Sequence, residues 1–102
     1  MIQEKRIIKQ QDKNRIITII HVFCPEAKIY LFGSYARGDY DHTSDIDLAI
    51  DAGKEIDLTN KCRIANIIDE LGLVQRTDVI DFHSVPEKIQ QEILKDGILW
   101  AS

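Results

Sequence analysis

The residues best suited to chemistry lie in one segment, residues 33–47, which reads GSYARGDYDHTSDID. The segment opens on the pair Gly33 and Ser34, and after ten further residues it closes on Asp45 and Asp47. A glycine that follows a strand lets backbone N–H groups approach a phosphate, and a serine hydroxyl can donate to a phosphate oxygen. The Gly-Ser pair therefore indicates a cradle for a triphosphate.

Asp45 and Asp47 are two residues apart, so on a strand their side chains project from the same face. Carboxylate oxygens are the ligands that hard cations such as Mg²⁺ require, and one such pair can share two ions. In a two-metal site one ion activates the acceptor hydroxyl, and the other neutralises charge on the triphosphate and the leaving pyrophosphate. The aspartate pair therefore predicts a metal site for phosphoryl-group transfer.

A third carboxylate on a neighbouring strand normally completes such a site, and the candidates are Asp78 and Asp81. These two residues are three apart, so on a regular strand they point to opposite faces and only one can join Asp45 and Asp47. The parity of the sequence does not choose between them.

The elements that must position these residues follow from the spacing of apolar residues. Helical periodicity predicts helices at residues 3–23, 57–71 and 86–97, whereas short β-branched and aromatic runs predict strands at residues 28–32, 45–50 and 77–82. Because helices and strands alternate, we expect one α/β (α+β) domain over residues 1–102, a small mixed sheet of about three strands covered by helices. The tail at residues 98–100 is expected either to pack on the core or to pair at a sheet edge.

The same patterns predict which side chains face the core. The expected inward positions are Ile46, Leu48 and Ile50 on the second strand, Leu58, Cys62, Ala65, Ile68 and Leu71 on the second helix, and Ile89, Ile93 and Leu94 on the last helix. The two cysteines, Cys24 and Cys62, are far apart and lack zinc-ligand spacing, so both are expected to be small buried hydrophobes.

Composition restricts the class of ligand. The chain has 102 residues, a net charge of −4 and a pI near 5.3, which argues against a surface that grips long nucleic acid through Lys and Arg. Small nucleotides or a protein are better candidate ligands, and the small size favours a partner or self-association. No apolar segment is long enough to cross a bilayer, and the N-terminus lacks a signal-peptide pattern, so the expected location is the cytoplasm.

Two other motifs are excluded at their key positions. Gly33 and Gly38 imitate a P-loop, but Asp39 stands where the phosphate-binding lysine is required. An EF-hand beginning at Asp39 would need glycine where Ser44 stands and glutamate where Ile50 stands. The acids of this loop outside the Asp-x-Asp pair are therefore expected to be solvated rather than metal-bound.

The Gly33-Ser34 pair, the spacing to Asp45 and Asp47, and an aspartate on a later strand resemble the DNA polymerase β-like nucleotidyltransferase superfamily. GSYARG and SDIDL in particular resemble the minimal nucleotidyltransferases, called MNT proteins, and the likeness covers nearly the full chain. The resemblance implies the nucleotidyltransferase fold, with Asp45 and Asp47 as catalytic metal ligands. In that family the third carboxylate is the first aspartate of a segment like TDVIDF, which implies Asp78, with Asp81 as the fallback.

The family also implies substrates and partners. The resemblance implies two Mg²⁺ ions and ATP, with Gly33, Ser34 and Arg37 binding the nucleotide. Tyr35 occupies a position that is often basic in the family, which leaves Arg37 as the nearby cation for the triphosphate. Arg37 could equally be an exposed or salt-bridged residue. MNT proteins commonly act as antitoxins beside a HEPN toxin, in some pairs by transferring AMP from ATP to a tyrosine hydroxyl of that ribonuclease. The alternatives are a non-catalytic antitoxin that neutralises by complex formation, and a subunit of a small-molecule nucleotidyltransferase acting as a homo- or hetero-oligomer.

Overall fold

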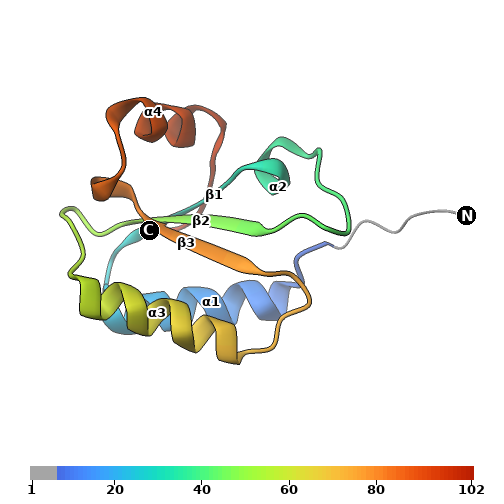
Figure 1. Ribbon diagram of the computed structural model, residues 1–102, viewed down its shortest axis with the longest axis horizontal. Helices are drawn as coiled ribbons and strands as arrows, with labels where there is room; N and C mark the ends of the chain where they lie inside the picture. Colours follow the sequence, from blue (N-terminus) through green and yellow to red (C-terminus); the bar gives the residue numbers. More distant parts are fainter. Residues whose placement is uncertain (1–6) are drawn as a thin grey trace, which may run out of the picture.

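The computed structural model describes residues 7–102, and within this range four strands form one sheet in the order β3-β2-β1-β4 (Figure 1). β1 (Lys28–Phe32) pairs antiparallel with β2 (Ile46–Asp51) and with β4 (Ile98–Ala101). β3 (Thr77–Asp81) runs parallel to β2. The mixed α+β class is as predicted, but the sheet has a fourth strand, because the tail pairs along the open edge of β1.

Helices cover both faces of this sheet. α1 (Gln10–Phe23) and α3 (Leu58–Glu70) lie side by side on one face, and α4 (Glu87–Asp96) lies on the other (Figure 1). The short α2 (Ser34–Arg37) follows β1 directly, and a 3-10 turn, η1 (Phe82–Ser84), follows β3. No helix of the described range has both the length and the apolar character needed to cross a membrane.

The first helix starts later than the sequence pattern predicts. α1 begins at Gln10, after Lys9, whose backbone is extended with φ −67° and ψ 140°. Ile7 precedes the helix and is exposed, so it takes no part in the helical stripe. The predicted start at residues 3–6 lies outside the described residues. The other two long helices agree with their predicted ranges, and Asp57 caps α3 by accepting a hydrogen bond from the Asn60 N–H at 2.8 Å.

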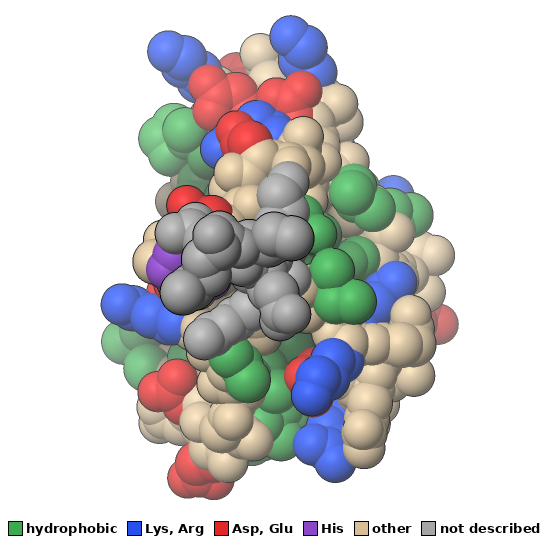
Figure 2. All heavy atoms as spheres, turned by 90° about the vertical axis from the view of Figure 1, so that its right-hand side faces the viewer, with side chains coloured by type: hydrophobic (Ala, Val, Ile, Leu, Met, Phe, Trp, Pro, Cys, Tyr) green, Lys and Arg blue, Asp and Glu red, His purple; other side chains and the backbone are tan. Residues whose placement is uncertain are grey.

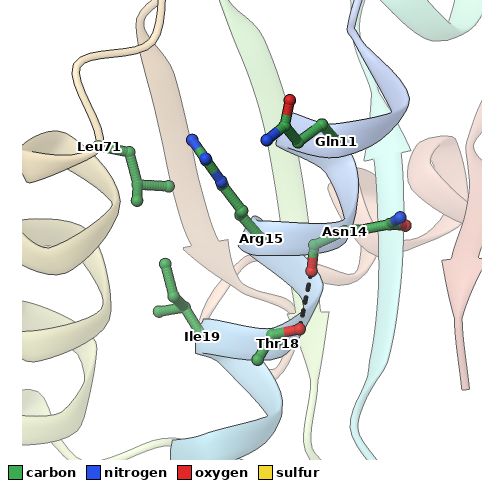
Figure 3. A pocket seen from close by; sticks show the side chains of 6 residues that line it. All are labelled: Gln11, Asn14, Arg15, Thr18, Ile19 and Leu71. Atoms are coloured by element: carbon green, nitrogen blue, oxygen red, sulfur yellow. Dashed lines mark hydrogen bonds between the residues drawn. The ribbon is translucent and has the colours of Figure 1, made fainter.

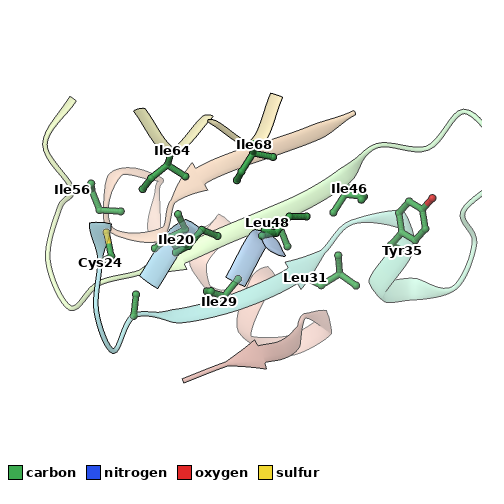
Figure 4. Packing of buried hydrophobic residues seen from close by; sticks show 13 residues of the cluster. Ile20, Cys24, Ile29, Leu31, Tyr35, Ile46, Leu48, Ile56, Ile64 and Ile68 are labelled. Carbon is green, nitrogen blue, oxygen red and sulfur yellow. The ribbon is translucent and has the colours of Figure 1, made fainter. Parts of the chain in front are cut away.

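The main core fills the space between the sheet and the pair α1 and α3 (Figure 4). Ile46, Leu48 and Ile50 of β2 all point into it and are fully or almost fully buried, which confirms their predicted common face. Ala49 is buried on the opposite face, in a smaller cluster with Phe82 and Ile93, because α4 covers that side. The central strand β2 is therefore buried on both faces, whereas β3 is half-buried over most of its length.

Four of the predicted inward positions are wrong, three on α3 and one on α4. On α3 the buried side chains are Ile64 and Ile68, whereas Leu58 is 72% exposed and Cys62 and Ala65 are also exposed. The contact stripe is offset from the predicted one because the larger isoleucines fill the gap between helix and sheet. Cys62 is therefore not a buried hydrophobe, although Cys24 is. On α4 the same competition buries Ile93 and leaves Leu94 exposed.

Candidate active site

The strand register brings two distant carboxylates together. Asp47 on β2 lies opposite Asp78 on the parallel strand β3 and opposite Phe32, the last residue of β1. Residues that pair across adjacent strands project from the same face, so the carboxylates of Asp47 and Asp78 share one face of the sheet. Asp45 stands one residue before β2 begins and two before Asp47. The structure thus places Asp78, and not Asp81, on the side of the Asp-x-Asp pair.

Electrostatics link the three carboxylates. The pKa of Asp47 is raised above its ordinary value, first by burial and then by the negative charges of Asp78 and Asp45, while the positive charge of Arg37 partly offsets the rise. Burial and like charge both disfavour an ionised carboxylate, so this face of the sheet concentrates negative charge that Arg37 and Arg76 compensate only in part. A bound cation would relieve that repulsion.

Asp81 has a different environment. Its side chain is 1% exposed and accepts hydrogen bonds from the Ile56 N–H at 2.8 Å and the His83 N–H at 3.1 Å. The Lys61 ammonium lies 3.7 Å from the same carboxylate. Asp81 therefore anchors the connection between β2 and α3 to the end of β3, on the face that α3 covers.

Stability measurements should separate these two aspartates. We expect Asp81→Asn to lower the free energy of unfolding by about 1–3 kcal/mol, because one of the two carboxylate oxygens becomes an amide N–H₂ that cannot accept, so that either the Ile56 N–H or the His83 N–H loses its acceptor. Asp78, whose side chain is 42% exposed, should tolerate Asn with little loss. Urea unfolding of both variants tests this difference, and equal destabilisation would contradict the assigned environments.

Gly33 forms the turn between β1 and α2, and this turn requires glycine. Its backbone has φ 73° and ψ −153°, a conformation that side-chain-bearing residues rarely adopt. A Cβ atom built on Gly33 would collide with Oδ2 of Asp47. The turn therefore needs glycine for two reasons, and Ser34, the first residue of α2, directly follows the point where the backbone approaches Asp47.

Arg37 closes the short helix and stands near the same site. Its Nε lies 3.4 Å from Oδ2 of Asp39, and both side chains are well exposed. The guanidinium is also close enough to Asp47 to offset part of the rise in the pKa of that carboxyl. An exposed pair of this kind contributes little to stability, so Arg37 can leave Asp39 at small cost.

A pocket of about 260 Å³ opens beside Gly33, between α2 and α4. Its walls are Phe32, Gly33, Arg37, Ile89, Glu92, Ile93 and Asp96. Acidic and basic side chains gather on the upper part of the molecular face toward which the loop after α2 projects (Figure 2). Nothing in the sequence marks Glu92 and Asp96 as site residues, because an acidic pair one helical turn apart is ordinary on an exposed helix.

A larger, shallow groove lies on the opposite side of the sheet. It has a volume of about 660 Å³ and lies between α1 and the end of α3, where Ile19 and Leu71 line it and Arg15 extends from α1 toward Leu71 (Figure 3). The hydrogen bond from the Thr18 hydroxyl to the Asn14 carbonyl, 2.9 Å long, stays within α1. Among the described residues none that lines this groove is acidic, so it is separate from the candidate active site.

The carboxylates of Asp45, Asp47 and Asp78 suit a hard cation, although the three side chains do not surround a common cation position. In the described part of the chain no three His, Cys, Asp or Glu residues stand at metal-ligand spacing. Asp45, Asp47 and Asp78 nevertheless supply only carboxylate oxygens, and two of them raise the pKa of the third. Carboxylate oxygens are what Mg²⁺ prefers, so the chemistry of the residues fits this ion.

Comparison with known proteins decides the family. Residues 14–102 match the family described as polymerase beta, nucleotidyltransferase. The chain belongs to this nucleotidyltransferase family. The protein adenylyltransferase MntA of Shewanella oneidensis is 30% identical in an alignment of 97 positions that covers 93% of this chain and 69% of the relative. The nucleotidyltransferase resemblance expected from GSYARG and SDIDL is thus confirmed.

Solved structures agree in fold. A crystal structure of a toxin–antitoxin with AMP-PNP superposes with a TM-score of 0.73 at 29% identity, covering 86% of this nucleotidyltransferase and 71% of that chain. A complex of tri-AMPylated Shewanella oneidensis HEPN toxin with its MNT antitoxin gives a TM-score of 0.70 at 26% identity, covering 91% and 71%. A minimal nucleotidyltransferase at 19% identity, with a TM-score of 0.67, supports the fold alone.

Proposed function

We propose that this nucleotidyltransferase is an antitoxin that transfers AMP from ATP to a tyrosine hydroxyl of a HEPN ribonuclease toxin. The observation that carries the proposal is the register of β2 and β3, which sets Asp47 beside Asp78 next to the Gly33 turn. Support comes from the similarity to a protein named adenylyltransferase and to an antitoxin solved with its tri-AMPylated toxin. The acidic net charge of −4 suits a basic ribonuclease surface.

Asp45, Asp47 and Asp78 would hold two Mg²⁺ ions. When bound, the ions supply activation of the acceptor hydroxyl and neutralisation of charge on the triphosphate. Asp78 is accessible to an incoming acceptor, since its side chain is half-exposed beside Arg76, whose Nε is 3.3 Å from Oδ1 of Asp78. In the transfer the acceptor oxygen bonds to the α-phosphorus, pyrophosphate leaves, and Asp78 accepts the hydroxyl proton.

Gly33, Ser34 and Arg37 would bind the triphosphate. The turn at Gly33 lies against Asp47, Ser34 follows it as the first residue of α2, and Arg37 can exchange Asp39 for a phosphate. The pocket between α2 and α4 adjoins these residues and has room for the rest of the nucleotide. Its carboxylates, Glu92 and Asp96, keep phosphate groups on the side of Arg37.

We further propose that residues 1–102 act as one nucleotidyltransferase domain in the cytoplasm, in a hetero-oligomer with the toxin. The described residues form one sheet with shared cores on its two faces, which supports joint folding.

Intact-mass spectrometry of a candidate HEPN partner tests the proposed function. The partner is incubated with this protein, ATP and Mg²⁺, and Asp45→Asn/Asp47→Asn serves as the matched variant. We expect mass increments of AMP on the partner that disappear with the variant, and peptide mapping should place them on tyrosine. A stable complex without any increment would instead indicate neutralisation by binding alone.

The same assay distinguishes Asp78 from Asp81. Asp78→Asn should abolish the AMP increments while the fold stays intact. Asp81→Asn, compared per folded molecule at low temperature, should retain them.

A further inference from the structure

A buried polar contact joins α2 to the strand that carries Asp78. Tyr35, the second residue of α2, is 7% exposed, and its hydroxyl accepts a hydrogen bond from Nε2 of Gln75 at 3.2 Å. Gln75 is 9% exposed and stands two residues before β3 begins. The contact thus links the helix that carries Ser34 and Arg37 to the segment that leads to Asp78.

The carboxamide of Gln75 uses both of its hydrogens. Besides the Tyr35 hydroxyl, Nε2 donates to the backbone carbonyl of Ile7 at 3.1 Å. An amide N–H₂ group has two donors, so this side chain bridges two separate segments at once. Because Gln75 is buried, losing either acceptor would leave one of its N–H donors without that partner, at a cost in free energy. The two hydrogen bonds therefore stabilise the observed position of the Gln75 side chain.

The neighbouring residue fixes the start of β2. The Arg76 carbonyl accepts a hydrogen bond of 2.8 Å from the N–H of Ile46, the residue between Asp45 and Asp47. Residues 75 and 76 therefore contact α2 through a side chain and β2 through the backbone. The three segments that supply the candidate site residues meet at this point.

The aromatic ring of Tyr35 has packing partners in addition to the hydrogen bond of its hydroxyl group. It stacks on Tyr40 with ring centroids 4.3 Å apart and planes 15° from parallel. The ring also forms one end of the main core, beyond Ile46 and Leu31 (Figure 4). Since Tyr40 lies in the loop between α2 and Asp45, the stack connects the triphosphate side and the metal side by a second route.

We propose that Tyr35 and Gln75 are positioning residues of the transfer reaction. They set the distance between Ser34 and Arg37, which bind the triphosphate, and the carboxylates of β2 and β3. This inference rests on the proposed function. Catalysis that depends on placement is sensitive to small shifts, and a displacement of about 1 Å can lower a rate by about a hundredfold.

Tyr35→Phe tests the proposal because it removes only the hydroxyl and leaves the ring in the core. We expect it to raise KM for ATP and to lower kcat/KM by about tenfold. Tyr30→Phe is the matched control, since Tyr30 also has a packed ring, near Phe82 at 6.2 Å, but lies in the cluster beneath α4. The control should leave both kinetic constants unchanged.

A double variant shows whether the contact itself matters. Gln75→Met removes both donors at similar size, and Tyr35→Phe/Gln75→Met should lose no more kcat/KM than Gln75→Met alone, because both changes break one interaction. Additive losses would contradict the proposal. So would a Tyr35→Phe variant with a lower melting temperature but unchanged KM and kcat, which would mark a contact that only stabilises the fold.

A binding measurement separates this inference from the proposed function. Calorimetric titration of the full chain with a non-hydrolysable ATP analogue and Mg²⁺ should show weaker binding for Tyr35→Phe than for Tyr30→Phe. If the wild-type chain binds the analogue but transfers no AMP, the proposed function fails while the positioning effect is still measured. Equal affinities for the two variants would overturn the positioning role.

Discussion

Replacing Asp47 by asparagine is expected to lower AMP transfer by about a thousandfold and, at neutral pH, to raise the stability of the fold. The loss follows from removing the carboxylate that lies between Asp45 and Asp78, since a metal ligand supplies several kcal/mol and each 1.36 kcal/mol is about a factor of ten. The gain follows because burial and two like charges raise the pKa of Asp47 in the folded chain. Function and stability therefore conflict at this residue.

The stability gain should depend on pH with a definite sign. A carboxyl whose pKa is higher in the folded than in the unfolded state holds its proton longer when folded, so stability falls as pH rises through that interval. Asn has no such penalty. The difference in melting temperature between variant and wild type should therefore vanish in acid, below the unfolded pKa of an aspartate, and reach its full value above the raised pKa of Asp47.

Asp51→Asn on the same strand is the control with the opposite sign. Burial alone would raise the pKa of Asp51, but hydrogen bonds from the Gly53 N–H and His83 outweigh it and leave that pKa lowered. Its replacement should destabilise the fold at neutral pH, an effect that fades as the pH falls through the lowered pKa. Thermal melts from acid to neutral pH test both variants, and a stability loss in Asp47→Asn at neutral pH would contradict the assigned repulsion.

Gly33→Ala should give the second largest effect, a loss of AMP transfer of about a hundredfold together with about 1–3 kcal/mol of stability. The added methyl must push aside the Asp47 carboxylate, and the positive φ of 73° strains any residue other than glycine. Both the phosphate side and the metal side of the site move as a result. Transfer assays and urea unfolding measure the two effects separately.

Gly53→Ala is the matched control for this substitution. Gly53 also has a positive φ, of 81°, but a Cβ there meets nothing within 4 Å. It should lose stability through backbone strain and keep full transfer activity. Normal transfer by Gly33→Ala, with stability losses equal in the two variants, would show that the close approach of Gly33 to Asp47 has no catalytic importance.

The parts of the fold that depend on the spacing of neighbouring residues could be predicted from the sequence. The ranges of β1 and α3, and the common face of Ile46, Leu48 and Ile50, follow from side-chain alternation and capping, which the sequence displays directly. The rotation of α3 does not, because the contact stripe at Ile64 and Ile68 depends on the volume left between helix and sheet. A fourth strand also depends on which edge remains open once the others have paired.

The candidate site divides in the same way. The Gly-Ser turn and the Asp-x-Asp pair are local motifs, so the sequence marks them. The side on which Asp78 lies depends on the register in which β3 pairs with β2, and the contact between Gln75 and Tyr35 depends on where β3 packs. Both involve residues far apart in the chain. Whether Asp78 and Arg37 act as assigned stays a prediction for the assays above.

The parallel pairing of β2 and β3 has a consequence for the order of folding. Parallel neighbours cannot be joined by a tight turn, and here the whole of α3 separates Asp47 from Asp78. Such non-local pairing closes slowly relative to hairpins, so the carboxylate face forms only when the crossover has docked. Denatured chains then lack the site, and any ion or nucleotide that it holds shifts the folding equilibrium toward the native state by mass action.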